Sequence, residues 1–320
     1  MRLVETCLAI QKRLITVVFL AASTVVGLFL VGCEKEFTYE PIPEPLRIVL
    51  YSFLEEDSIF KVNIRQSAPI TSNDSRSITQ EGTLSVYADS ILVLSKQCGG
   101  DTSWIELPSL KVRSEVKYRL EFESVELVLT RAQTTVPKPL ATMKVDTISA
   151  VSLSVEQRDT LMVCKIAFKD SIDLANFYQL SIYSITQAAI DSPTVIKEID
   201  FLKTDKVFLS TIQSTGLWKG IDFQGLFTDA EIDGMNYVIS IALPKSYFIN
   251  DDLLVRKSVS FGIYSLSSEY FEYYRSRKIA EGYLGVPFLD PVQVYSNVEN
   301  GLGCVGGISS RWVNFEAIIP

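Results

Sequence analysis

The sequence predicts a mainly-β protein, with two antiparallel β-sandwich-like domains after a cleaved N-terminal signal peptide. From residue 46 onward, short apolar runs recur at roughly 8–12-residue spacing, as they do in antiparallel sandwiches. Within several runs the apolar residues alternate with polar ones. Phe60, Val62 and Ile64 alternate in this way over residues 59–65, which is the period of a half-buried strand.

The first 32 residues have the pattern of a secretory signal. A basic pair precedes an apolar run over residues 14–31. Leu30-Val31-Gly32-Cys33 then places a small residue before a cysteine, as in bacterial lipoproteins. We expect cleavage between Gly32 and Cys33 and attachment of lipid, including palmitate, to Cys33. The alternative is an uncleaved anchor, because the apolar run is about as long as the roughly 17–25 residues that span a bilayer.

Residues 33–45 are expected to form a lipidated tether. Pro41, Pro43 and Pro45 stand at every second position, which favours extended polyproline II at roughly 3.1 Å per residue. The sequence therefore predicts a folded body that stands away from the membrane to which Cys33 attaches it.

A small charged cluster follows the expected lipid site directly. Glu34, Lys35 and Glu36 resemble the surface-export signal of one large group of Gram-negative bacteria. On this interpretation the protein is lipid-anchored in the outer membrane and exposed at the cell surface. The alternative is a solvated group of linker charges.

The charge and the missing histidine exclude several functions. The chain has a net charge of −8 and no His among 320 residues. An acidic body repels nucleic acid, and without His there is no Ser-His-Asp or Cys-His catalysis within the chain. The acids Asp170, Asp173, Asp251 and Asp252 could pair as acid and base only if a cleft held them at a set separation. We predict no enzyme, no catalytic residue and no cofactor.

Three cysteines remain after Cys33, and their spacing is not that of a metal or thioredoxin site. Cys164 lies in an apolar strand-like run and is expected to be buried. Cys98 and Cys304 each stand near glycines, and an oxidising compartment could pair them. Whether they pair is left open.

The domain boundary is expected at Val136-Pro137-Lys138-Pro139, because proline cannot donate into a strand ladder. Residues 46–136 are predicted to form an N-terminal, immunoglobulin-like β-sandwich, and residues 140–320 a C-terminal β-rich domain. Ser267 is expected to cap a helix over residues 268–281 with an aromatic face. The predicted strands cover 46–53, 59–65, 83–87, 91–94, 104–107, 118–123, 125–129, 147–153, 161–168, 177–185, 207–212, 237–243, 255–264, 292–295 and 312–319.

Two segments match ligand-binding motifs only in part. Residues 301–307 fit G-x-G-x-x-G, but no helix follows them, so we expect a glycine loop between two terminal strands. Residues 229–234 resemble the opening of a calcium loop, but the twelfth position is Ser240 instead of Glu. An acidic turn is expected there, and no metal site is predicted.

Several stretches together resemble the lipoproteins that carry domain of unknown function 4249, over nearly all of residues 33–311. They include "LRIVLYSF", "FKVNIRQSAPI", "TTVPKP", "NFYQLSIYS", "LFTDAEIDGMNYVISIAL" and "SLSSEYFEYYRS". The most specific block is residues 287–307, with Cys304 and Val305 where an aromatic residue is usual. No catalytic residues are known for the family, so none are carried over.

The resemblance implies an accessory or ligand-binding partner of a TonB-dependent transporter in nutrient uptake. The alternative is a structural or assembly lipoprotein of the envelope without a small-molecule ligand. We expect partner or ligand contacts on exposed loops, with the polar stretch 67–81 and the glycine run 300–307 as candidates.

Overall fold

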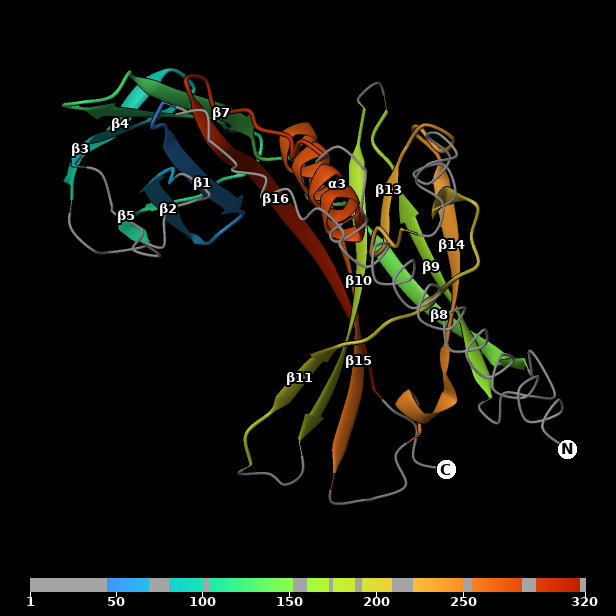
Figure 1. Cartoon of the computed structure of the whole chain (residues 1–320). Helices are drawn as coiled ribbons and strands as arrows, with labels where there is room; N and C mark the ends of the chain where they lie inside the picture. The colour runs from blue at the N-terminus through green and yellow to red at the C-terminus, as the bar shows by residue number, and fades with distance from the viewer. Residues whose placement is uncertain are drawn as a thin grey trace, which may run out of the picture. The chain divides into compact units, whose positions relative to one another are not determined.

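The computed structural model describes residues 45–68, 81–99, 104–151, 160–172, 175–187, 192–208, 221–249, 255–283 and 292–316. Strands dominate these segments, so the predicted mainly-β class is confirmed (Figure 1). The expected signal peptide, lipid site and nearly all of the tether lie outside the described residues. In the described part of the chain, no helix is both long and apolar enough to cross a bilayer.

The first sandwich closes over one apolar core. One of its layers contains β1 (Ile48–Glu55), β2 (Ile59–Gln66) and β5 (Ile105–Lys111). The other contains β3 (Gly82–Ala88), β4 (Ile91–Cys98), β6 (Lys117–Ser124) and β7 (Thr130–Thr135), in the order β4-β3-β6-β7. Alternate side chains from both layers meet in the core, among them Leu50, Phe60, Val62, Leu84, Leu120 and Phe122.

The second sandwich has its own core. Its outer layer contains β10 (Phe177–Gln187), β11 (Val195–Glu198), β13 (Leu226–Thr228) and β15 (Arg256–Leu266). The facing layer has the order β12-β14-β9-β8, formed by β12 (Leu202–Lys203), β14 (Asn236–Pro244), β9 (Leu161–Lys169) and β8 (Met143–Val151), and the 3-10 helix η2 (Lys245–Tyr247) follows β14. Buried residues of the two layers meet between them, including Cys164, Ile166, Tyr178, Leu180, Phe227, Ile241 and Phe261.

One long strand belongs to both sandwiches. The first half of β16 (Gly301–Glu316) pairs in parallel with β1, from Ile48 opposite Gly301 to Glu55 opposite Ile308. Its second half pairs antiparallel with β15, from Leu266 opposite Ile308 to Ser258 opposite Glu316. The resulting eight-stranded sheet has the order β11-β10-β15-β16-β1-β2-β5, with β13 beside β10 (Figure 1). This sheet is continuous across the boundary expected near residues 136–140.

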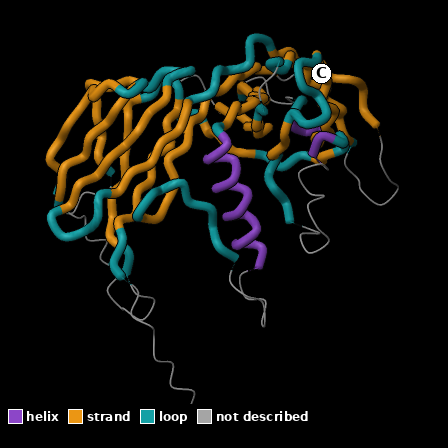
Figure 2. Tube along the Cα trace, turned by 90° about the horizontal axis from the view of Figure 1, so that it is seen from above, coloured by secondary structure: helices purple, strands orange, loops and turns teal. Residues whose placement is uncertain are grey.

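The helix α3 (Ser268–Tyr283) begins where predicted, and it packs against β16 and β10. Figures 1 and 2 show it beside the long strands, between the strands of the two sandwiches. Its Tyr273 lies 5.7 Å from Phe53 of β1, and its Phe271 lies 4.8 Å from Phe177 of β10, measured between ring centroids. The aromatic face of the helix is therefore packed against the rings of both sandwiches.

Several strand predictions are wrong. No strand covers residues 125–129, where Val125 and Val128 are exposed, and residues 292–295 have irregular backbone. Val207 and Phe208 begin a helical turn, and residues 209–212 lie outside the described part. The sequence missed β7, because its buried side chains are the small Thr130, Ala132 and Thr134, which give no apolar alternation.

The glycine run is also different from the expectation. Residues 301–307 are strand, not loop, and they are the part of β16 that pairs with β1. A Cβ atom on Gly303 would lie 2.1 Å from the Leu50 carbonyl oxygen, and on Gly306 it would lie 2.6 Å from the Tyr270 Cβ atom. The glycines therefore allow β16 to pass closely between β1 and α3.

Candidate ligand-binding site

The outer layer of the second sandwich has one apolar and one polar face. In β10, Leu180 and Ile182 point into the core between the sheets. Because side chains alternate along a strand, Gln179, Ser181 and Tyr183 point to the opposite face. Polar residues on this side of a sheet are expected to meet solvent or a ligand.

Helix α3 covers one end of this polar face and leaves a pocket of about 270 Å³ beside it. Gln179 and Ser181 of β10 form part of its lining, with Leu266 of β15 and Ile308 of β16 as its apolar part. Gln179 and Ser181 are buried, so their amide and hydroxyl groups lie at the inner end of the pocket.

Four tyrosines and two carboxylates complete the lining: Tyr183, Tyr264, Tyr270, Tyr274, Glu55 and Glu198. They come from β10, β15, α3, β1 and β11. Both glutamates are exposed, whereas the tyrosines are half-buried. The pocket therefore combines aromatic walls with negative charge.

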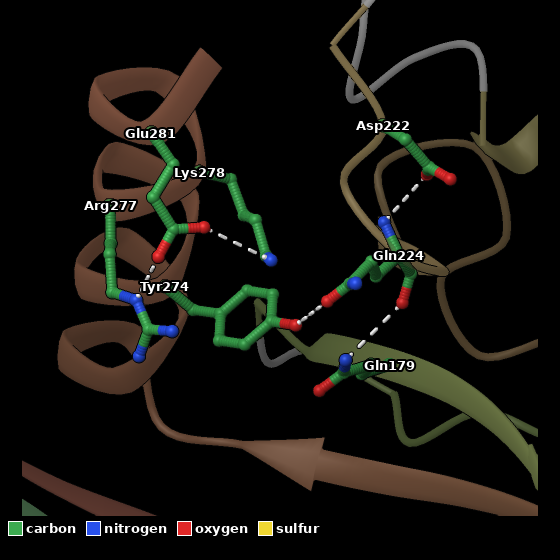
Figure 3. Close-up of polar contacts among 7 residues, drawn as sticks. All are labelled: Gln179, Asp222, Gln224, Tyr274, Arg277, Lys278 and Glu281. Atoms are coloured by element: carbon green, nitrogen blue, oxygen red, sulfur yellow. Dashed lines mark hydrogen bonds and ion pairs between the residues drawn. The ribbon is translucent and has the colours of Figure 1, made fainter. Parts of the chain in front are cut away.

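The wall formed by α3 is held by hydrogen bonds to the loop before β13 (Figure 3). The Tyr274 hydroxyl donates to the side-chain oxygen of Gln224. Gln179 Nε2 donates to the main-chain oxygen of Gln224 over 3.2 Å, and the Gln224 N–H donates to Asp222 over 2.8 Å. Gln224 therefore links the helix to β10, which fixes the side chains of Tyr274 and Gln179 at the pocket.

The basic residues nearest to this wall already have acidic partners. Arg277 Nε lies 2.7 Å and Lys278 Nζ 3.2 Å from oxygens of Glu281, one turn further along α3 (Figure 3). Lys278 Nζ also lies 5.6 Å from the ring centroid of Tyr274, within the range of a cation–π contact.

The hydroxyls of Tyr183 on β10 and Tyr264 on β15 are hydrogen-bonded to each other. Burial raises the pKa of Tyr264, and Tyr183, Glu55 and Glu198 raise it further. Burial also raises the pKa of Tyr183, and the charge of Glu198 adds to this shift. Both tyrosines are therefore neutral at physiological pH, and the fields of both glutamates reach the Tyr264 hydroxyl.

A tryptophan extends the aromatic surface beyond the pocket. Trp312 of β16 lies 5.5 Å from Tyr183 and 5.4 Å from Tyr264 between ring centroids, with an interplanar angle of 88° to Tyr264. A Cβ on Gly262 would lie 2.4 Å from the Trp312 ring. Because Gly262 has no side chain, the Trp312 indole can lie against the sheet at this position.

A second cluster groups three acids at the end of β9. Oxygens of Asp170, Asp229 and Asp233 lie within 4.8 Å of one another. The Tyr178 hydroxyl donates to Asp170 over 2.5 Å, as does the Gly234 N–H over 2.8 Å, and Asn176 N–H donates to Asp229 over 2.7 Å. These hydrogen bonds satisfy the two buried carboxylates, Asp170 and Asp229. Residues 229–235 form the expected acidic turn.

The other residues singled out from the sequence are mostly outside the described ranges. These are Gly32, Cys33, Glu34, Lys35, Glu36, Asp173, Asp251, Asp252 and residues 69–80 of the polar loop. Cys98, Cys164 and Cys304 are free thiols, so no Cys98–Cys304 bond is present. Cys164 is buried in the second core, as predicted.

The pocket is not predicted by any local sequence motif. Its lining runs from Glu55 to Ile308, so no local motif contains it. One available signal was the alternation over residues 177–185, where polar side chains occupy the face opposite the apolar one. The predicted aromatic face of α3 is buried at Phe271 and Tyr273 but only half-buried at Tyr270 and Tyr274, which line the pocket.

Comparisons with known proteins point to one family. The family described as "Domain of unknown function (DUF4249)" matches residues 34–311. No curated protein matches the chain. Among solved structures, a β-glucuronidase from glycoside hydrolase family 2 is similar at 8% identity and a TM-score of 0.21, over 85% of this chain and 20% of that one. The chain thus spans about a fifth of that enzyme.

A second solved structure is a segment of two fibronectin type III domains from chicken tenascin. It shares 10% identity at a TM-score of 0.19, over 70% of this chain and 90% of that segment. At such TM-scores neither likeness carries an argument about activity.

Proposed function

Since this chain belongs to the DUF4249 family over residues 34–311, we propose that it is a surface-exposed outer-membrane lipoprotein that binds a ligand for a TonB-dependent transporter in nutrient uptake. It acts by binding and not by catalysis. The anchor is lipid on Cys33, after cleavage behind Gly32, and Glu34, Lys35 and Glu36 direct the chain to the surface.

The pocket beside α3 is the observation that carries the proposal. Small-molecule sites are concave and combine aromatic or apolar walls with a few placed polar groups. Here four tyrosines form the walls, and Gln179 and Ser181 supply buried polar groups. Strands and a helix hold these side chains, so the site is formed before the ligand arrives.

A structural or assembly role in the envelope is the second candidate, and strand β4 favours it. This strand is at the edge of its sheet, and Ile91, Leu92 and Val93 are 69%, 51% and 43% exposed. An edge strand with exposed apolar side chains can pair with a strand of another protein. A lipoprotein of this kind would hold a partner through β4 and need no pocket.

Crosslinking in intact cells, followed by purification of the lipoprotein, tests the proposal. We expect a TonB-dependent transporter in the eluate. Two variants separate the candidates, because Leu92→Lys alters only the β4 edge and Tyr264→Ala alters only the pocket. Loss of the partner in the first variant favours the structural role, and loss in the second favours the ligand-binding role. If the unmodified protein never captures a transporter, and ligand binding is absent, the structural role replaces the proposed one.

A further inference from the structure

The charged residues that line the pocket beside α3 are all acidic. Glu55 and Glu198 line it, and no lysine or arginine stands among its described lining residues. Within the described part of the chain, neither carboxylate forms an ion pair. Two carboxylates that share one pocket without a counter-ion repel an anionic ligand and attract a positive one.

The neighbouring cations do not neutralise this charge. Arg277 and Lys278 share the carboxylate of Glu281, and Lys203 Nζ lies 2.7 Å from Asp222, so each of these basic groups is already engaged by an acid. Among the described residues, the carboxylates of Glu55 and Glu198 therefore have no basic partner, and a positive ligand could supply one.

The aromatic walls also favour a positively charged ligand. Tyrosine rings attract ammonium and guanidinium groups through their π faces, and sets of such rings recognise alkylated ammonium groups. Tyr183, Tyr264, Tyr270 and Tyr274 supply four rings. One of them already has a cation nearby, because Lys278 Nζ lies 5.6 Å from the Tyr274 centroid.

Two of the remaining lining residues are aliphatic and can contact an apolar stem that carries the positive group of the ligand. Leu266 and Ile308 contribute aliphatic surface, and a pocket of about 270 Å³ holds a group of a few carbon atoms. Phenol, hydroxyl and amide oxygens can accept hydrogen bonds from an ammonium group, which has three donors and no acceptor when it is a primary amine. These features together describe a short alkyl chain that ends in a positive charge.

We propose that this pocket binds an organic cation, an alkylammonium or guanidinium group, with Glu55 and Glu198 as its counter-ions and the four tyrosines around its stem. This inference rests on the proposed ligand-binding function and adds the chemical class of the ligand. The cation can come from a free amine or from a lysine or arginine side chain of a protein.

Calorimetric titration of the full-length lipidated protein, in nanodiscs of phosphatidylcholine, tests the class of ligand. The probes are n-butylamine and Nα-acetyl-lysine amide, with Nα,Nε-diacetyl-lysine amide as the neutral match and methyl glucoside as a sugar. We expect the two amines to bind and the diacetylated probe to bind at least about tenfold more weakly, since charge-assisted hydrogen bonds are the strong ones. Tighter binding of n-butylamine identifies a free amine, and tighter binding of acetyl-lysine amide identifies a protein side chain.

Charge-neutral variants test the residues. Glu55→Gln and Glu198→Gln should each weaken amine binding about tenfold, and added salt should weaken it in the unmodified protein. Glu126→Gln, which removes an exposed carboxylate outside the pocket, should leave it unchanged. Equal binding of the neutral probe, binding of the sugar alone, or unaltered affinity in both pocket variants would overturn the inference.

The two proposals fail separately. A protein that captures a transporter but binds none of the amines retains the proposed function and loses the cation. A protein that binds the amines through Glu55 and Glu198 but captures no transporter retains the cation site and loses the accessory role.

Discussion

Ser267 and Gly307 are joined by two hydrogen bonds across 40 residues of chain. The Ser267 N–H donates to the Gly307 carbonyl oxygen over 2.9 Å, and the Gly307 N–H donates to Ser267 Oγ over 3.0 Å. The same hydroxyl accepts from the Tyr270 N–H over 3.3 Å. One serine thus caps α3 and attaches its first turn to β16.

The first prediction removes this hydroxyl. Ser267→Ala should lower the free energy of unfolding by about 1–3 kcal/mol, because it removes a helix cap and leaves the buried Gly307 N–H unpaired. Urea unfolding followed by circular dichroism measures the change. Ser268→Ala, at the exposed neighbouring position, should change it by less than about 0.5 kcal/mol. Equal effects of the two substitutions would contradict a special role for Ser267.

The second prediction concerns the passage of β16 past its neighbours. A Cβ on Gly307 would lie 2.7 Å from the Thr135 carbonyl oxygen and from Val136 Cα. Gly307→Ala should therefore destabilise the protein by about 1–3 kcal/mol, as overpacking does. Gly282→Ala in α3 is the control, because its Cβ meets only the Ile221 side chain, at 3.2 Å. Helix propensity favours that change, so thermal unfolding should separate the two variants.

The strands that the sequence predicted well are those in which apolar residues alternate with polar ones. In β2, Phe60, Val62 and Ile64 are fully buried, as their spacing required. The pattern failed where small polar residues fill the core, as Thr130 and Thr134 do in β7. It also failed at Val125, whose 91% exposure no local pattern indicates.

The glycine run and the pocket depend on contacts between distant segments. Whether residues 301–307 form a loop or a strand depends on β1, which lies far away in the sequence and pairs with them. In the same way, Glu55 and Glu198 share a pocket only because β16 joins β1 to β15 within one sheet. Sequence alone predicted the class of fold and the helix. It did not predict the pocket between the helix and the sheet.

The third prediction concerns the acidic turn. Burial raises the pKa of Asp229, hydrogen bonds from Asn176 oppose the shift, and the charges of Asp170 and Asp233 add to it. A raised pKa in the folded state means that stability falls as pH rises from the unfolded pKa through the folded one. Asp229→Asn should therefore be more stable than the parent at pH 7, and this difference should shrink toward pH 4.

Asp222 provides a control of opposite sign. Burial acts to raise its pKa, but the hydrogen bonds from Lys203 and Gln224 outweigh burial and lower it. The resulting stability is present above the unfolded pKa and is lost as pH falls through the folded pKa. Asp222→Asn should be less stable than the parent at pH 7. Parallel pH profiles for the two variants would contradict this assignment.

The fourth prediction concerns thiol reactivity, since only the thiolate reacts rapidly. Burial raises the pKa of Cys164 to about 12, and burial together with the charge of Glu269 raises that of Cys304 still further. Cys98 is only half-buried. Labelling with a maleimide at pH 7.5, read by peptide mass, should modify Cys98 first and the other two only in denaturant. Early labelling of Cys304 would contradict the buried position of β16.

The fifth prediction tests the anchor. Cys33→Ala should release the protein from the membrane fraction, because the thiol that carries the lipid is lost. Cys98→Ala is the matched control and should remain with the membranes through washing with carbonate. Retention of the Cys33→Ala variant would identify residues 14–31 as a true membrane span.

The double membership of β16 determines when the molecule can fold. β1 emerges from the ribosome about 250 residues before its parallel partner β16, and contacts of such high contact order form slowly. Until residues 301–316 have been synthesised, each sandwich lacks a strand and neither core is closed. Completion of both sandwiches is therefore a late event that has to wait for the last described strand of the chain.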